Sequence, residues 1–189
     1  YSTIAARLDD PNKLQDIVSR FPLVVHAAGP FRYTLQPVVE ACIRSGVHYV
    51  DINGDISCFE RIHAFDRQAR EAGIMLLPGA GFDVVPTDCL ALFLKSNMPD
   101  ANRLRMAFAS IGSTVSHGTA MTVAGKLGEG GLIRENGKLV KRPLGEHGMM
   151  VDFGAKSRFV MSIPWGDVFT AYHTTGIPNI EVFTAMKPS

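Results

Sequence analysis

The segment "IMLLPGAGFDVVPTD" (residues 74–88) decides how the first half of the chain folds. It reads as an apolar strand that runs into two glycines and then into a helix that begins near Pro86. A glycine-rich joint of this kind is either the phosphate-binding turn of a nucleotide site or another strand-to-helix joint of a similar fold. The surrounding residues distinguish these two interpretations.

The joint lacks the features of a phosphate-binding turn. A dinucleotide fingerprint has the form G-x-G-x-x-G, and an acidic residue follows about 20 residues later, at the end of the next strand. Val84 stands where the third glycine would be, and Asp100 precedes the next apolar run instead of ending it. Pro86 also lacks the N–H that would help to hold phosphate. We therefore predict that Gly79-Ala-Gly81 is a different joint.

Strands and helices alternate regularly through the first half of the chain. We expect strands over residues 22–29, 47–52 and 74–81, and helices over residues 36–46, 56–73 and 86–97. The run 22–29 shows no polar alternation, which is typical of a strand covered on both faces. Ser57 and Glu60 have the spacing of a capping box. Alternating strands and helices predict parallel strands joined by right-handed crossovers, an α/β fold with a doubly wound sheet.

The second half of the chain has a different character. It contains β-type runs at residues 103–110, 156–164, 167–175 and 180–186, one candidate helix at 117–128, and a glycine-rich segment at 125–138 that reads as a mobile loop. This pattern predicts an α+β domain with a mixed, largely antiparallel sheet. We place the domains at residues 1–98 and 99–189, and we expect the second to be incomplete.

Composition excludes several classes of protein. The chain has 189 residues, 46% of them apolar, and a net charge of +1, so we expect neither nucleic acid nor an anionic membrane as partner. The cysteines and histidines show no metal-ligand spacing, and the three cysteines fit reduced thiols. No apolar run approaches the ~20 residues of a membrane span, and no leader opens the chain. We expect a cytoplasmic protein that binds a small-molecule substrate and holds no metal.

The three predicted strands end in similar sequences, "AAGPF", "DINGD" and "GAGFD". Ligands on parallel sheets bind at the carboxyl ends of the strands, and glycine lets backbone approach a ligand closely. Each sequence alone is compatible with an ordinary tight turn. Because all three should meet at one edge of the sheet, we predict a binding site there.

Three motifs resemble those of a known family. "VVHAAGPFRYTLQPVVEACIRSGVHYVDINGD" followed by "AGFDVVPTD" resembles the saccharopine dehydrogenase-like oxidoreductases, including the trans-acting enoyl reductases. The shared motifs are A-G-P-[FY], Y-x-D-x-x-G-[DE] and G-F-D-x-x-P-[ST]-D, and the resemblance runs from about Leu8 to the end. Members have an N-terminal Rossmann domain with a glycine-rich NAD(P) loop and then an α+β substrate domain. This chain departs from the pattern at Asp55, where Glu is commoner, and starts past that loop, so the resemblance implies the back half of a Rossmann-type sheet.

The resemblance also implies roles for particular residues. The residues expected to bind the cofactor are Ala28, Gly29, Pro30, Phe31, Asp51, Asp55, Gly81 and Phe82. The first four would lie against the nicotinamide-ribose half, whereas Gly81, Phe82 and Asp83 would line the mouth between the domains. The implied cofactor is NAD(P), with NADP slightly preferred.

Candidates for substrate binding and proton transfer are few. Ser116, Gly118 and Thr119 could begin a helix aimed at a polar substrate group, although plain helix capping is the alternative. His26 lies in an apolar strand and reads as a core histidine. Asp83 and His117 are the catalytic candidates, because both fall where the two domains should face each other.

Two functions remain open at this point. The first is an NAD(P)-dependent oxidoreductase that transfers a hydride between nicotinamide and a small or acyl-type substrate held over residues 29–31. The alternative is a non-catalytic dinucleotide-binding or scaffold module of the same fold. In either case the apolar run at 180–186 predicts an unpaired sheet edge, and we expect a homodimer through that C-terminal sheet.

Overall fold

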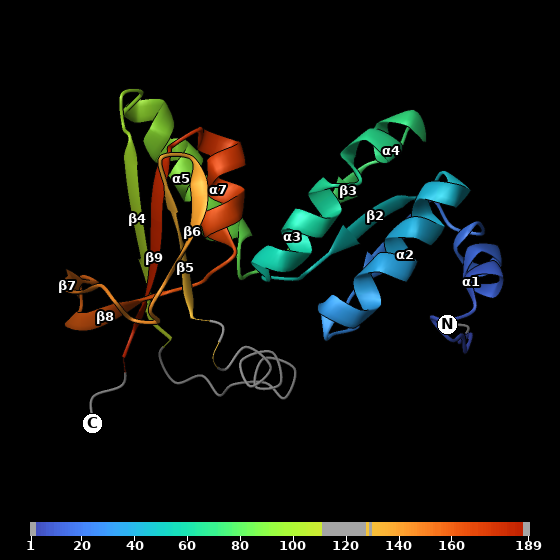
Figure 1. Ribbon diagram of the computed structural model, residues 1–189, viewed down its shortest axis with the longest axis horizontal. Coiled ribbons are helices and arrows are strands. Elements are labelled where there is room, and N and C mark those ends of the chain that lie inside the picture. The colour runs from blue at the N-terminus through green and yellow to red at the C-terminus, as the bar shows by residue number, and fades with distance from the viewer. Residues whose placement is uncertain (1–2, 111–127, 129, 187–189) are drawn as a thin grey trace. The chain divides into compact units, whose positions relative to one another are not determined.

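A computed structural model describes residues 3–110, 128 and 130–186 of the chain (Figure 1). It divides into two compact units, Tyr1–Val85 and Pro86–Ser189. Helix α5 (Val85–Asn97) therefore groups almost entirely with the second unit. The assignment of domains to 1–98 and 99–189 stays a prediction.

The first unit is a parallel sheet with helices between its strands. Sheet A has the order β1-β2-β3, and its strands are β1 (Leu23–His26), β2 (His48–Asp51) and β3 (Leu76–Leu77). Its helices are α1 (Pro11–Val18), α2 (Phe31–Ser45), α3 (Ile56–His63) and α4 (Asp66–Glu71). The predicted alternation and the parallel pairing are confirmed.

The helices pack against one face of sheet A. Val24, Tyr49 and Leu76 lie in register across the sheet and join the core formed by α1, α2 and α3. On the opposite face Val25 is 65% exposed and Leu77 is 45% exposed. The described residues therefore cover β1 on one face only, and our prediction of a strand covered on both faces was wrong. The reason is the strand order, because right-handed crossovers that all step in one direction place their helices on the same face.

Two local predictions in the first unit were wrong. The helix expected over 56–73 is broken at Ala64 and Phe65 into α3 and α4. The capping box of Ser57 and Glu60 does not form, because Asp55 is the N-cap residue and its carboxylate accepts a hydrogen bond from the Ser57 N–H at 2.9 Å.

The second unit is the predicted mixed, largely antiparallel sheet with helices. Sheet B comprises β4 (Arg103–Phe108), β5 (Gly131–Glu135), β6 (Lys138–Arg142), β7 (Gly148–Asp152), β8 (Ser157–Ile163) and β9 (Asn179–Ala185). Its order is β6-β5-β9-β8-β7, and β4 pairs with β9 in parallel. Helices α5 and α7 (Asp167–Thr175) share one core with β4 and β9, built around Ala91, Leu104, Ala171 and Ile180 (Figure 1).

The run at 167–175, expected as a strand, is helix α7. Its buried residues Val168, Ala171 and Thr175 recur at helical spacing, and Gly176 ends it with φ +70°. Its β-branched and aromatic residues favour a strand by propensity, but burial of this stripe against α5 and β9 outweighs that preference. The expected loop at 125–138 is also wrong from residue 131 onward, where β5 and β6 form a hairpin through Asn136 and Gly137. The candidate helix at 117–128 lies outside the described residues, apart from Gly128.

Strand β9 is an interior strand of sheet B. It pairs with β4 along one side, and with β5 and β8 along the other. The unpaired edge that we predicted at 180–186 is therefore absent, because a strand 76 residues earlier covers it.

Candidate functional site

The carboxyl ends of β1, β2 and β3 meet at one edge of sheet A, as the parallel pairing requires. We call this region the carboxyl edge, and it comprises residues 26–31, 51–55 and 79–83. It contains each of the predicted cofactor-binding residues and the catalytic candidate Asp83. The sequence prediction that these strand ends come together is thus confirmed.

Asp51 joins the exits of β2 and β3. Its side chain is fully buried, and Oδ1 accepts hydrogen bonds from the Asn53 N–H at 3.0 Å, from Asn53 Nδ2 at 2.6 Å and from the Gly79 N–H at 2.8 Å. The Asp51 carbonyl accepts a further bond from the Ala80 N–H at 2.8 Å. Charge-assisted bonds to backbone N–H groups are strong, so Asp51 holds the shape of two loops at once.

A polar chain connects β1 to the same carboxylate. The Tyr49 hydroxyl donates to Asp51 Oδ2 at 2.8 Å, and His26 Nδ1 lies 2.9 Å from the Tyr49 oxygen. Burial, reinforced by the negative charge of Asp51, raises the pKa of Tyr49, which stays a protonated phenol. Burial lowers the pKa of His26, although the Asp51 charge and the Ala28 backbone oppose that effect.

Sequence reasoning did not predict this polar chain of three side chains. Tyr49 and Asp51 lie two residues apart and therefore on the same side of β2. His26 is the last residue of β1 and lies opposite Asp51 in the register. The i, i+2 spacing of two polar groups in an apolar strand was the available signal, and the partner on β1 had no local signature.

The joint between β3 and α5 is shaped by packing. Gly79 has φ +72°, and a Cβ at this position would lie 2.8 Å from the Phe59 ring. Gly81 is also tight, since a Cβ there would lie 3.1 Å from the Ile52 Cβ. Glycine at position 79 is thus required for close contact with α3, which is consistent with a structural joint and not with a phosphate-binding turn.

The exit of β1 has the opposite character. Ala28, Gly29 and Pro30 are exposed, and a Cβ on Gly29 would meet only ordinary contacts, 3.8 Å from the Phe31 ring. The Thr34 hydroxyl fixes this turn by donating to the Ala28 carbonyl at 2.6 Å. The turn is therefore an ordered, exposed surface to which another molecule can bind.

Phe82 and Asp83 also present their side chains at this edge. Phe82 is 90% exposed, and the Asp83 carboxyl lies against Gly54, where a Cβ would be 3.4 Å from Asp83 Oδ2. Partial desolvation raises the pKa of Asp83. A carboxyl with a raised pKa holds its proton more readily, which suits proton transfer.

The other predicted residues are placed as follows. The Asp55 carboxylate is the N-cap of α3 and accepts bonds from Ser57 N–H and Ser57 Oγ, each at 2.9 Å. Ser116, His117, Gly118 and Thr119 lie outside the described residues. Of the two catalytic candidates, only Asp83 is therefore placed.

The last two residues of the G-F-D-x-x-P-[ST]-D motif, Thr87 and Asp88, form hydrogen bonds within the second unit. The Thr87 hydroxyl donates to Asp167 Oδ1 at 2.6 Å, and the Thr174 hydroxyl donates to Asp88 Oδ2 at 2.7 Å. Both bonds join α5 to α7. Asp167 is completely buried, so these side chains fix the packing of the two helices.

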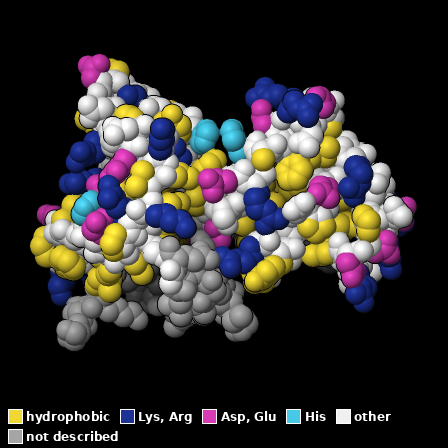
Figure 2. All heavy atoms as spheres, viewed as in Figure 1, with side chains coloured by type: hydrophobic (Ala, Val, Ile, Leu, Met, Phe, Trp, Pro, Cys, Tyr) yellow, Lys and Arg dark blue, Asp and Glu magenta, His cyan; other side chains and the backbone are white. Residues whose placement is uncertain are grey.

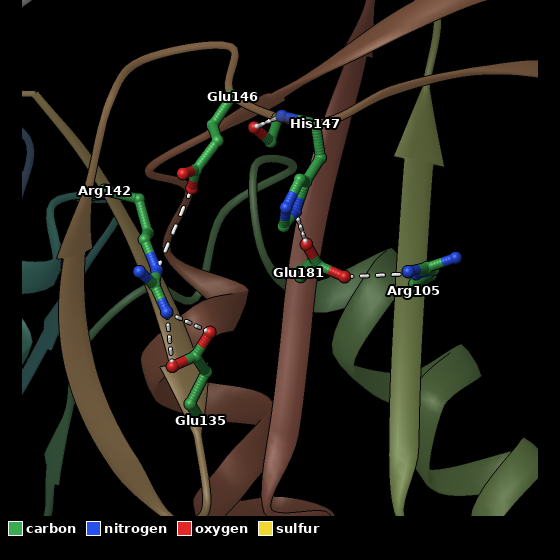
Figure 3. A network of polar contacts seen from close by, with 7 residues as sticks. Arg105, Glu135, Arg142, Glu146, His147 and Glu181 are labelled. Atoms are coloured by element: carbon green, nitrogen blue, oxygen red, sulfur yellow. Dashed lines mark hydrogen bonds and ion pairs between the residues drawn. The ribbon is translucent and has the colours of Figure 1, made fainter.

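A separate network of charges lies on sheet B (Figure 3). Glu181 on β9 is only 8% exposed; it bonds Arg105 on β4 at 3.1 Å and His147, which precedes β7. Burial alone would raise the pKa of Glu181, but His147 and Arg105 hold it below its ordinary value. Arg142, Glu135 and Glu146 form a more exposed cluster of ion pairs nearby.

The described residues contain no group of three or more His, Cys, Asp or Glu side chains placed to hold a metal ion, and no helix among them is long and apolar enough to cross a membrane. Cys42, Cys58 and Cys89 form no disulfide bond. On the face shown in Figure 2, acidic and basic side chains are interspersed.

Comparison with known proteins shows what the chain is similar to. Residues 1–77 match the protein family described as Saccharopine dehydrogenase NADP binding domain, and this match includes β1, β2 and the polar chain between them. The chain is thus similar, over part of its length, to the saccharopine dehydrogenase-like oxidoreductases. The resemblance inferred from the three motifs is thereby confirmed.

Individual relatives cover part of the chain. The mouse saccharopine dehydrogenase-like oxidoreductase is 32% identical over 96 residues, which are 50% of this chain and 22% of the relative. The trans-acting enoyl reductase of Mycobacterium ulcerans is 31% identical over 87 residues, 45% of this chain and 21% of the relative. The chain thus matches about a fifth to a quarter of the length of these curated relatives.

A solved structure shows the same fold. Apo saccharopine dehydrogenase (L-Glu forming) from Saccharomyces cerevisiae superposes with a TM-score of 0.63 and 14% identity, covering 96% of this chain and 44% of that one. The likeness therefore extends over both units of the chain.

Proposed function

We propose that this protein is an NAD(P)-dependent oxidoreductase that transfers a hydride between nicotinamide and a small or acyl-type substrate. The observation that carries the proposal is the carboxyl edge of sheet A, where Asp51 and Tyr49 lock three strand ends and leave Ala28 to Pro30 exposed. Ligands of parallel α/β sheets bind at this edge. The match to an NADP-binding domain over the same residues supports a nicotinamide dinucleotide, with NADP slightly preferred.

The residues at the carboxyl edge fit such a cofactor in different ways. Ala28, Gly29, Pro30 and Phe31 would contact its nicotinamide-ribose half, and the exposed Phe82 with Gly81 would border it at the β3 joint. The Asp51 carboxylate already accepts hydrogen bonds from Asn53, Gly79 and Tyr49, and the Asp55 carboxylate accepts them from Ser57. They would therefore support the cofactor through the loop they hold.

The chemistry divides between the protein and its cofactor. The bound dinucleotide supplies the hydride. Asp83 would hold the proton that accompanies it, because its pKa is raised and the adjacent Gly54 leaves room beside its carboxyl. His117 remains the other candidate for this role, and Ser116, Gly118 and Thr119 remain candidates for substrate contact.

The names of the relatives, and not the geometry of this chain, support the substrate class that we propose. One relative is named a trans-acting enoyl reductase, and others are named for saccharopine dehydrogenase. We therefore propose either an enoyl group of an acyl substrate or a small keto or imino compound as the hydride acceptor.

Steady-state kinetics tests the proposal. Purified intact protein with NADPH or NADH and a panel of enoyl and keto substrates should consume the reduced cofactor, as measured by absorbance. Binding of the cofactor without consumption across the panel would support the alternative of a non-catalytic dinucleotide-binding module. Absence of both binding and turnover would refute the proposal.

A homodimer and a cytoplasmic location remain predictions. Because β9 is an interior strand, a dimer through sheet B would have to use an outer strand such as β4, β6 or β7. Light scattering of the intact protein tests the dimer, and cell fractionation tests the location.

A further inference from the structure

His26 carries a buried hydrogen-bonding atom that has no partner. The residue is only 6% exposed, and its Nε2 makes no hydrogen bond to any described residue. Buried polar side-chain atoms in folded proteins nearly always have a partner, since an unpaired one loses its hydrogen bonds to water without replacement. The missing partner of Nε2 therefore requires a physical explanation.

The polar chain of the first unit determines what kind of partner Nε2 needs. Asp51 Oδ1 already accepts three bonds, and Tyr49 uses its only proton to donate to Asp51 Oδ2. The Tyr49 oxygen must then accept a proton from His26 Nδ1. With its proton on Nδ1, a neutral imidazole presents a lone pair at Nε2. Burial lowers the pKa of His26 and thus favours this neutral form. The missing partner is a hydrogen-bond donor.

The position of His26 indicates where that donor comes from. His26 is the last residue of β1 and directly precedes the exposed turn Ala27–Pro30. The Phe31 ring packs against its imidazole at a centroid distance of 5.1 Å and an interplanar angle of 72°, and so fixes the ring beside this turn. A molecule resting on residues 28–30 would be adjacent to His26.

We propose that His26 is a ligand-binding residue whose Nε2 accepts a hydrogen bond from an O–H or N–H donor of the molecule bound at the carboxyl edge. The inference rests on the proposed function, under which that molecule is a nicotinamide dinucleotide. The donor is then a hydroxyl of the nicotinamide ribose or the carboxamide N–H. The sequence prediction of a core histidine is thus extended, because the Nδ1 side of the ring is structural and the Nε2 side serves the ligand.

Two substitutions separate the two sides of the ring. His26→Asn places an amide group where Nδ1 lies, so it can still donate to Tyr49 but offers no acceptor at the Nε2 position. His26→Gln reaches the Nε2 position with its carbonyl oxygen and leaves the position of Nδ1 empty. The two variants are matched in chemistry and differ in which bond they retain.

The test measures dissociation constants for NADPH and NADH by calorimetry, and melting temperatures, in the intact protein. We expect His26→Asn to melt close to the wild type but to bind roughly 5- to 100-fold more weakly, the effect of one lost hydrogen bond. His26→Gln should show the reverse, a lower melting temperature with affinity nearer the wild type.

The 3-acetylpyridine analogue of NADP lacks the carboxamide N–H and identifies the donor. If that group is the donor, His26→Asn binds the analogue as the wild type does; if a ribose hydroxyl is the donor, the penalty persists.

The possible failures are distinguishable. If the wild-type protein binds NADPH or NADH but His26→Asn binds it equally well, Nε2 meets only water and the inference is overturned while the proposed function stands. If the wild-type protein binds neither dinucleotide, the proposed function fails and the inference fails with it.

Discussion

Gly29 and Gly79 both follow strands of sheet A, yet the two residues are glycine for different reasons. Gly79 has a positive φ and lies so close to Phe59 that no side chain fits. Gly29 has room for a Cβ and lies in an exposed turn. The fold thus requires glycine at position 79. The fold does not require glycine at position 29, so a ligand that approaches the backbone there could be the reason for it.

Substitution of these two glycines should therefore affect different quantities. Gly79→Ala should lower the free energy of unfolding by about 2–5 kcal/mol, the sum of backbone strain and overpacking against Phe59. Gly29→Val should leave the melting temperature within a few degrees and reduce turnover by about 100-fold, because a displacement of about 1 Å at the nicotinamide costs that much. Denaturant unfolding and steady-state rates measure both. Normal turnover of Gly29→Val would place the active site elsewhere.

Asp83 offers a test that depends on pH. Its pKa is raised by desolvation, so in the folded protein ionisation is disfavoured relative to the unfolded chain. The contribution to stability is present below the ordinary pKa of 3.8 and is lost as the pH rises through the folded value. Asp83→Asn should thus be slightly more stable than the wild type at pH 7 and equal to it at low pH, while its turnover falls at every pH. Equal stability at all pH values would mean that Asp83 is freely solvated.

At the scale of elements, long-range polar contacts decide how sheet B is held together. Glu181 lies on β9 and connects β4, through Arg105, with the segment that precedes β7, through His147 (Figure 3). Glu135 makes a similar ion pair with Arg142, but its side chain is 37% exposed, compared with 10% for Glu181. Removing one partner of a buried ion pair lowers the free energy of unfolding much more than removing one partner of an exposed pair.

Glu181→Gln should destabilise the protein, and Glu135→Gln serves as its control. We expect Glu181→Gln to lower the free energy of unfolding by about 1–3 kcal/mol at pH 7 and Glu135→Gln by about 0–1 kcal/mol. Burial raises the pKa of Glu181, but His147 and Arg105 lower it overall. Its stabilisation is therefore present above the ordinary value of 4.5 and is lost as the pH falls through the lower folded value. Urea unfolding between pH 3 and 7 should show the two variants converge, and parallel curves would contradict the network.

At the scale of the whole molecule, the 189-residue chain should bind NAD(P) weakly. It contains no G-x-G-x-x-G turn, and such a turn with its helix N-terminus normally holds the pyrophosphate. Under the proposed function, the carboxyl edge would contact only the nicotinamide-ribose half of the cofactor. Calorimetric titration of this chain with NADPH should give no saturation at micromolar concentrations. A low micromolar dissociation constant would show that a phosphate site exists among residues that we assign to other roles.

The sequence by itself determined the parallel sheet, the convergence of three glycine-containing strand ends, and the resemblance to the saccharopine dehydrogenase-like oxidoreductases. These depend on periodicity and motifs within about 30 residues, which a linear reading captures. Only the tertiary structure decided that α7 is a helix, that β9 is an interior strand and that His26, Tyr49 and Asp51 form one chain. His26 and Tyr49 lie 23 residues apart, and Thr87 and Asp167 lie 80 apart. Such partners have no local signature, because burial and pairing across the fold select them after each element has formed.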